Sequence, residues 1–260
     1  MTRIPLTVTI ITLNEEANIS RAIQSVKWAD EIIVVDSGSS DRTLEIAKQL
    51  GAKVFTQPWS GYGQQKNFAQ SKASNPWILN LDADEEVTPG LKAEIQSQLL
   101  EVSEGRSEAK GFYFPRKTFY LGRWIKHGGW YPNHLIRLAE GAVSKWTEPH
   151  VHEELLVTGK VLGLKEPLHH HSFPGIIDQV STNLRFSRLG SEDLMIKGHR
   201  PKLSKLILKP LGKFIETYFI KKGFLDGLPG FIISVNAAYS IFLKYAYLFE
   251  PEIKVESSHR

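Results

Sequence analysis

Two carboxylates one residue apart, Asp82 and Asp84, stand directly after the apolar segment 77–81. Carboxylates at positions i and i+2 in a turn at the end of a strand can converge on a divalent cation, and such hard oxygen ligands suit Mg²⁺ or Mn²⁺. A cation held there would neutralise charge on a diphosphate leaving group. The competing interpretation is a solvated acidic turn that caps the next helix. The position after a buried strand favours the metal site.

A second polar cluster begins at Asp36, which follows the apolar residues 32–35 and is followed by S-G-S-S-D-R-T. The small residues allow another molecule to approach the backbone closely. Ser40 and Asp41 are explained by capping of the helix that follows. Capping does not explain Asp36, whose carboxylate can accept hydrogen bonds from a nucleotide base or ribose.

The elements that must position these residues alternate along the first hundred residues. Strands are predicted at 6–13, 31–36, 53–56 and 77–81, and helices at 16–26, 41–50, 64–71 and 89–100. This alternation predicts an α/β fold, with a mainly parallel sheet and helices on both faces. Ligands of such sheets bind at the carboxyl ends of the strands, where Asn14, Asp36 and Asp82 lie. Beyond residue 172 the pattern is mostly helical.

The order of three motifs resembles that of the inverting family 2 glycosyltransferases of the GT-A fold. The motifs are T-I-I-T-L-N-E-E (9–16), V-V-D-S-G-S-S-D-R-T (34–43) and L-N-L-D-A-D-E (79–85). The resemblance implies that a nucleotide-diphosphate sugar, with a UDP-sugar favoured, donates the sugar. It also implies roles for individual residues: Thr12, Asn14, Glu15 and Asp36 hold the nucleotide, Asp82 lies by the ribose and the metal, and Asp84 ligates the metal.

A narrower likeness points to the bacterial lipopolysaccharide core glucosyl- and heptosyltransferases. It rests on G-Y-G-Q-Q-K-N-F-A (61–69), V-H-E (151–153), the H-x-S-F pattern at 170–173 and K-K-G-F-L-D-G-L-P-G (221–230). The acceptor is therefore expected to be a lipid-linked saccharide. Lys66 and Asn67 follow the glycine-rich loop and are expected to touch the phosphate or sugar of the donor, with a solvated position as the alternative.

An inverting transferase needs one base, which takes the proton from the attacking hydroxyl. Glu153 is the candidate, because it follows a strand-like stretch in the region where the resembled family places its base. Glu154 is the competitor if the register is displaced by one residue. His170 matches the H-x-S-F pattern, which implies contact with the metal or the diphosphate, and a structural histidine is the alternative.

The C-terminal segment 199–250 is basic, with eight Lys or Arg residues against three Asp or Glu. Apolar residues recur at helical spacing from Leu203, beside a stripe of lysines at 202, 205, 209 and 213. Basic amphipathic helices of this kind lie in membrane interfaces, and core packing is the alternative for the apolar face. The run 228–249 is long enough to span a bilayer, but Asn236 and Lys244 favour a buried or interfacial helix pair.

These patterns predict the organisation and location of the chain. A catalytic domain is expected over residues 1–175, with a nucleotide-sugar half at about 1–100 and an acceptor half at about 101–175. A helical, membrane-associating region is expected over 176–260. The N-terminus lacks the pattern of a signal peptide, so we expect a cytoplasmic protein, peripheral on the inner face of the cell membrane and in contact with its anionic surface.

Other functions compete with this interpretation. The absence of cysteine excludes disulfides, thiolate metal sites and cysteine nucleophiles. A nucleotidyltransferase of similar fold would be expected to carry a glycine-rich, basic phosphate loop where this chain has T-L-N-E-E. A non-enzymatic basic protein could bind membranes or RNA. The tail lacks the interleaved aromatic and arginine motifs of RNA modules, so no nucleic-acid partner is expected.

Overall fold

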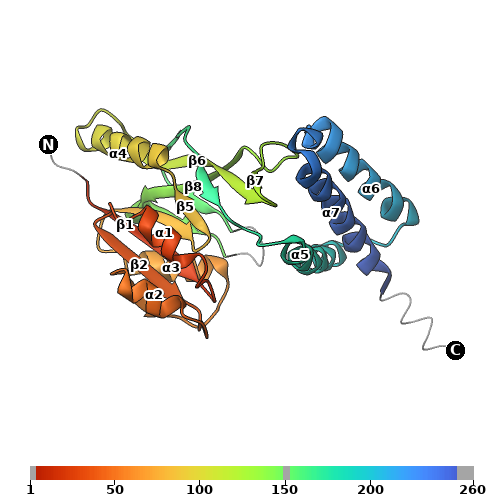
Figure 1. Ribbon diagram of the computed structural model, residues 1–260, viewed down its shortest axis with the longest axis horizontal. Coiled ribbons are helices and arrows are strands. Elements are labelled where there is room, and N and C mark those ends of the chain that lie inside the picture. The colour runs from red at the N-terminus through yellow and green to blue at the C-terminus, as the bar shows by residue number, and fades with distance from the viewer. Residues whose placement is uncertain (1–3, 149–152, 251–260) are drawn as a thin grey trace. The chain divides into compact units, whose positions relative to one another are not determined.

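The computed structural model describes residues 4–148 and 153–250, which form two compact units (Figure 1). Unit 1 comprises Met1–Lys117 and Pro132–Ser172, and unit 2 comprises Thr118–Tyr131 and Phe173–Arg260. The first two residues of the V-H-E motif lie outside the described residues. The segment 118–131 belongs to unit 2 because it is hydrogen-bonded to the C-terminal helical region. Gln179 accepts a hydrogen bond from the Tyr120 hydroxyl, and Asp226 accepts one from the backbone of His127.

Unit 1 is built on a mixed sheet. Its strands are β1 (Leu6–Thr12), β2 (Glu31–Asp36), β3 (Lys53–Thr56), β4 (Trp77–Asp82), β5 (Glu85–Val87), β6 (Ala109–Tyr120, ending in unit 2), β8 (Asn133–Glu140), β9 (Ser144–Trp146), β10 (Leu155–Val157), β11 (Lys160–Gly163) and β12 (Leu168–His170). The order is β3-β2-β1-β4-β8-β6-β12-β5, and β11 pairs with β6. The first four strands are parallel, whereas β8 runs antiparallel to β4 and β6. A separate hairpin joins β9 and β10.

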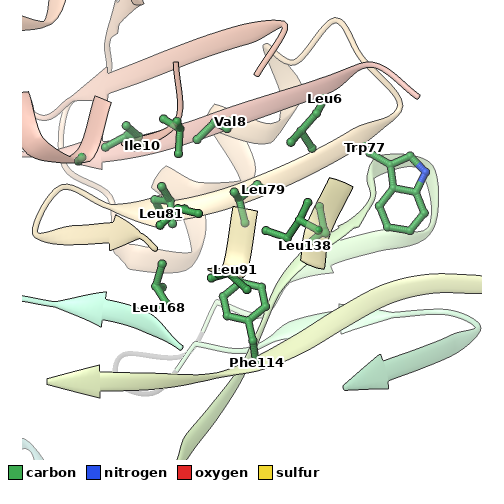
Figure 2. Close-up of a cluster of buried hydrophobic side chains, with 14 of the residues drawn as sticks. Leu6, Val8, Ile10, Trp77, Leu79, Leu81, Leu91, Phe114, Leu138 and Leu168 are labelled. Carbon is green, nitrogen blue, oxygen red and sulfur yellow. The ribbon is translucent and has the colours of Figure 1, made fainter. Parts of the chain in front are cut away.

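Helices cover both faces of the parallel strands. They are α1 (Ile19–Ser25), α2 (Thr43–Gln49), α3 (Tyr62–Ser71) and α4 (Pro89–Ser103), with a 3₁₀ turn at Gly141–Val143. Because side chains alternate along a strand, Val8 and Ile10 face α1 and α4, whereas Ile11 faces α3. Figure 2 shows the larger cluster, in which Leu79 and Leu138 meet side chains of β1 and α4. The predicted α/β fold with a mainly parallel sheet is confirmed.

A buried carboxylate at the opposite end of β2 from Asp36 ties four segments together. Glu31 accepts hydrogen bonds from Thr7 Oγ1 at 2.6 Å, Lys53 Nζ at 2.6 Å and the Ser74 backbone N at 2.8 Å. Burial alone would raise the pKa of Glu31. The bonds from Lys53, Thr7 and Ser74 outweigh burial and lower this pKa from its ordinary value of 4.5 to about 2.

This network predicts an acid-sensitive contribution to stability. Because the pKa of Glu31 is lower in the folded than in the unfolded chain, its contribution is present above pH 4.5 and is lost as the pH falls towards 2. Each pKa unit corresponds to about 1.4 kcal/mol, so about 3 kcal/mol is at stake over the window. Urea unfolding of Glu31→Gln should lack this dependence, whereas the exposed Glu108→Gln should retain it. Parallel wild-type and Glu31→Gln curves between pH 5 and pH 2 would contradict the assignment.

Unit 2 is mostly helical, as predicted. Its helices are α5 (Ile176–Ile196), α6 (Leu203–Ile215) and α7 (Gly227–Ala246), with a π-helical turn at Glu216–Ile220 and 3₁₀ turns at Gly223–Asp226 and Tyr247–Phe249. A short strand, β7 (Arg123–Trp124), pairs with the end of β6. Gln179 on α5 accepts a hydrogen bond from Asn236 on α7 at 2.7 Å. Within the described residues, the segment Gly223–Phe249 is long and apolar enough to cross a membrane.

Candidate active site

The carboxyl ends of three neighbouring parallel strands bring the predicted polar residues to one edge of unit 1. In the sheet register, Thr12 of β1 lies opposite Asp36 of β2, and Ile11 lies opposite Asp82 of β4. Asp36 and Asp82 therefore flank the end of β1. The Thr12 hydroxyl is buried and has no hydrogen-bond partner among the described residues, so it remains able to bond a ligand.

The loops after β1 and β2 are joined by hydrogen bonds from their own side chains. The Asp36 carboxylate accepts hydrogen bonds from the backbone N of Gly38 and Ser39. Ser39 Oγ accepts a bond from the Asn14 backbone N, and Asn14 Oδ1 accepts one from the Ser40 backbone N, each at 2.8 Å. Asn14 itself adopts a left-handed φ of 54°. The structure thus uses Asp36 and Asn14 to shape the predicted nucleotide loops.

Glu15 is less exposed than its neighbours in the first loop. Its backbone N donates to Thr43 Oγ1 at 2.8 Å, and its carboxylate accepts a bond from Asn18 at 2.7 Å. Burial raises the pKa of Glu15 more than the Asn18 bond lowers it, and the nearby charge of Asp84 raises it further. Glu15 and Asp84 are therefore close enough to interact electrostatically.

Asp82 lies among cations. Its Oδ2 is 2.6 Å from an Arg137 nitrogen, and its Oδ1 is 3.1 Å from Lys66 Nζ. Glu85 accepts the Asp82 backbone N–H and also contacts Arg137 at 3.2 Å and Arg116 at 3.3 Å. Burial raises the pKa of Asp82, but Arg137 and Lys66 outweigh it and hold this pKa well below the usual range. Asp82 is therefore ionised at neutral pH.

Lys66 connects Asp82 to the candidate base. This lysine of α3 is buried, and its Nζ lies 2.8 Å from Glu153 Oε1 as well as 3.1 Å from Asp82 Oδ1. The ammonium also stands 4.5 Å from the centre of the Trp146 ring, a cation–π distance. A buried ammonium is costly unless it is paired. Asp82 and Glu153 supply the paired charges, so both carboxylates contact the same ammonium group.

The β9–β10 hairpin and α3 fix the position of Glu153. The backbone N of Thr147 donates to the carbonyl of Glu154 at 2.9 Å, which sets the register next to Glu153. The side-chain amide of Asn67 bonds the backbone N and O of Trp146 at 2.9 and 3.0 Å. A Cβ on Gly63 would lie 2.0 Å from the Thr147 carbonyl oxygen, so only glycine allows this approach. Asn67 thus holds the hairpin, and Glu154 is exposed.

Asp84 faces His170 rather than the cations around Asp82. Its Oδ2 lies 3.2 Å from His170 Nε2, and its carbonyl accepts the His171 backbone N–H at 2.9 Å. Antiparallel pairing of β12 with β5 produces this meeting, because it sets His170 opposite Glu85. Burial raises the pKa of Asp84, but the charge and hydrogen bond of His170 outweigh it and lower this pKa.

The donor atoms present fit a cation held by few protein ligands. Among the described residues, no group of three His, Asp or Glu side chains is arranged to hold a metal ion. Asp84 and His170 offer one carboxylate oxygen and one imidazole nitrogen at a shared position. Mg²⁺ typically takes one or two carboxylates and completes its shell with water and phosphate oxygens. The pair is compatible with a site of that kind.

Four residues of this site were missed from the sequence: Glu85, Arg116, Arg137 and Trp146. Arg137 gave a usable signal, since a charged residue stands in the middle of the apolar strand L-I-R-L-A. Charged side chains are almost never buried unless they are paired. An arginine with apolar neighbours in a strand therefore predicts a carboxylate partner, although not which one.

Comparisons with known proteins identify relatives of this chain. A sequence profile of Glycosyl transferase family 2 matches residues 7–106. An uncharacterized glycosyltransferase of Rickettsia typhi is 34% identical over 257 residues, covering 94% of this chain and 87% of the relative. The lipopolysaccharide core biosynthesis glycosyltransferase LpsC of Rhizobium meliloti is 31% identical over 255 residues, covering 95% of this chain and 93% of the relative.

Among solved structures, one similar protein is glucosyl-3-phosphoglycerate synthase of Mycobacterium tuberculosis in complex with Mn²⁺, UDP-glucose and phosphoglyceric acid. It is 28% identical with a TM-score of 0.35, covering 46% of this chain and 45% of that chain.

The chain is a glycosyltransferase with the α/β architecture of the GT-A fold, and it belongs to glycosyltransferase family 2. The resemblance to this family and to a lipopolysaccharide core transferase is confirmed. The nucleotidyltransferase and the non-enzymatic binding protein are therefore set aside.

Proposed function

We propose that this protein is an inverting transferase that moves a sugar from a nucleotide-diphosphate sugar, with a UDP-sugar favoured, to a hydroxyl of a lipopolysaccharide core or related glycolipid. One observation carries the proposal. Lys66 Nζ bridges Asp82 of the predicted donor site and the candidate base Glu153, which are 71 residues apart in sequence. A donor-binding carboxylate and a neighbouring base are the groups that a single displacement requires.

In the proposed reaction, Glu153 accepts the proton of the acceptor hydroxyl. The oxygen then bonds to the anomeric carbon while the bond from that carbon to the diphosphate breaks, and the nucleoside diphosphate leaves. Because the attack is a single displacement from the opposite side, the anomeric configuration inverts. Lys66 holds one oxygen of Glu153 and thereby fixes the direction in which the carboxylate faces.

Asp84 and His170 are the proposed metal ligands, with Asp82 at the ribose and at the edge of the metal shell. A bound Mg²⁺ or Mn²⁺ would supply charge neutralisation to the diphosphate as it leaves. Arg137 and Lys66 keep Asp82 ionised and oriented by contacts of 2.6 and 3.1 Å. We propose that Thr12, Asn14, Glu15 and Asp36 line the nucleotide, with Thr12 offering an unused hydroxyl.

The relative and unit 2 support a proposal for the acceptor and the location. The name of the Rhizobium meliloti relative specifies lipopolysaccharide core biosynthesis, which supports a lipid-linked saccharide acceptor. Large apolar side chains are exposed along α6, among them Leu203, Ile207 and Leu211, beside the lysine stripe. Apolar and basic side chains together favour an anionic membrane interface. We therefore propose a cytoplasmic protein held peripherally on the inner face of the membrane.

Binding of several nucleotide sugars tests the proposed donor, and a transfer assay tests the proposed reaction. UDP-, GDP- and ADP-sugars are added to the purified protein with and without Mn²⁺, and the melting temperature is recorded. Ligands that bind the folded state raise the melting temperature, and we expect the largest rise from a UDP-sugar with Mn²⁺. Transfer to a core oligosaccharide acceptor should then release UDP and yield a product of inverted anomeric configuration by NMR. A product of retained configuration would overturn the proposed mechanism.

A further inference from the structure

A groove lies along the helix pair of unit 2, at a distance in sequence from every residue of the active site. Helices α6 and α7 lie side by side (Figure 1), and the groove between them has a volume of about 650 Å³. Its apolar lining includes Leu208 of α6 and Ile241 of α7, with the Tyr245 side chain also at its wall. The groove is open, so a ligand could enter from the surface.

The rim of the groove is cationic. Lys205, Lys209 and Lys213 all line it, spaced four residues apart on one face of α6. Lys213 is paired with Glu216 at 3.1 Å, and Glu216 also binds Lys221. Lys205 and Lys209 make no ion pair with any residue in the described ranges 4–148 and 153–250. Two uncompensated ammonium groups therefore face a groove with an apolar floor.

A glycine of α6 lines the groove. Gly212 lies in the interior of α6, and a Cβ at this position would meet no heavy atom within 4 Å. Glycine inside a helix costs about 0.5–1 kcal/mol relative to alanine. Its backbone here is not in the left-handed region that would require glycine. The sequence thus gives up helix stability at a position where a larger side chain would fill open space.

We propose that this groove is a binding site for an anionic glycerophospholipid. Lys205 and Lys209 hold the phosphate, and the first part of an acyl chain lies over Leu208 and Ile241 past Gly212. The inference deepens the proposed membrane location, on which it rests. Free phosphate would need no apolar floor, and the exposed Leu211 and Ile215 of α6 already present an apolar surface to a bilayer. One bound lipid would fix the orientation of unit 2 on the membrane.

Two measurements on the full-length chain separate site binding from surface attraction. The first is calorimetric titration with dihexanoyl phosphatidylglycerol below its micelle concentration, beside dihexanoyl phosphatidylcholine and inorganic phosphate. The second is sedimentation with vesicles of phosphatidylglycerol and phosphatidylcholine at low and high salt. We expect the wild type to bind the monomeric anionic lipid more tightly than either comparison ligand. Vesicle binding should weaken as salt rises, because the lysines contribute through screened charge.

Gly212→Leu fills the groove and keeps every charge. Leucine is a better helix former than glycine, so the variant should fold. We expect it to weaken binding of the monomeric lipid by at least about tenfold, the loss that follows from about two methylene contacts. Vesicle sedimentation at low salt should change less than twofold. Gly212→Ala is the matched control, because it improves the helix without filling the groove, and it should bind like the wild type.

The charge variants complete the test. Lys205→Gln with Lys209→Gln should weaken both monomer and vesicle binding, whereas the exposed pair Lys197→Gln with Arg200→Gln should affect vesicles alone. Monomer binding that survives Gly212→Leu, or inorganic phosphate that binds as tightly as the lipid, would overturn the lipid site. A wild type that ignores anionic vesicles at low salt would instead overturn the membrane location, whatever the monomer titration gives.

Discussion

Replacing Glu153 by glutamine is expected to slow sugar transfer by about 10²–10⁴-fold while donor binding persists. Glutamine has nearly the same shape but cannot accept the proton of the attacking hydroxyl. Lys66 keeps Asp82 as a partner at 3.1 Å, so the buried ammonium is not left unpaired and the fold should survive. Initial rates at saturating donor, together with the donor dissociation constant from calorimetry, separate the loss of chemistry from a loss of binding.

The next residue provides the matched control for this prediction. Glu154→Gln makes the same chemical change at an exposed side chain and should leave transfer near the wild-type rate. A Glu153→Gln variant within a few-fold of wild type would place the base elsewhere. If Glu154→Gln lost activity instead, the register of the motif would be displaced by one residue, as the sequence alone allowed.

Removing the carboxylate of Asp84 is expected to abolish the Mn²⁺-dependent part of donor binding. Asp84→Ala deletes the proposed carboxylate ligand beside His170, and Asp82, which Arg137 and Lys66 engage, is not expected to replace it. For a wild type saturated a hundredfold above its dissociation constant, the donor adds about 2.7 kcal/mol to the free energy of unfolding. The variant should lose the difference between melting temperatures measured with and without Mn²⁺.

Glu86 serves as the control for Asp84, because its carboxylate lies two residues on and contacts His171 at 3.3 Å. Glu86→Ala should keep the Mn²⁺ effect if the ligand position is specific. Circular dichroism must show that both variants are folded. A folded Asp84→Ala protein with an undiminished Mn²⁺ effect would remove Asp84 from the metal site.

The parallel strands could be predicted because their apolar residues must be buried on both faces of the sheet. Residues 32–35 are apolar and β-branched, which is typical of a strand buried on both faces, and the predicted strand 31–36 has the bounds of β2. The first helix begins later than its pattern indicated, at Ile19 rather than Glu16. The backbone carbonyl of Glu15 accepts bonds from Asn18 and Ile19, so the preceding residues form a turn that helical spacing cannot reveal.

The carboxylates of the candidate site could be located from local motifs, whereas the cations around Asp82 could not. Asp82 and Asp84 could be recognised because they directly follow a buried strand. Arg137 reaches Asp82 only through antiparallel pairing of β4 with β8, and such pairing joins residues 55 positions apart. Side-chain partners at that separation depend on register and twist, which no short pattern encodes.

For one residue, Asn67, the residue type indicated a donor contact, whereas the structure shows a contact with the backbone. Asn67 was expected at the donor, yet the structure engages both ends of its amide with the backbone of Trp146. An amide that bonds a main-chain N and O in this way looks the same in sequence as one that bonds a sugar. Its donor role stays a prediction.

The Asn67 contact has a consequence for how the sequence of the β9–β10 hairpin can vary. The amide bonds main-chain atoms of Trp146, which any side chain at that position would keep, and it also donates to Glu148 Oε1 at 2.9 Å. Substitutions elsewhere in the hairpin are therefore expected to leave the docking of α3, and with it the separation of Lys66 from Glu153, unchanged. Related chains can therefore vary most of the hairpin by point mutation without changing how Lys66 and Glu153 are held together.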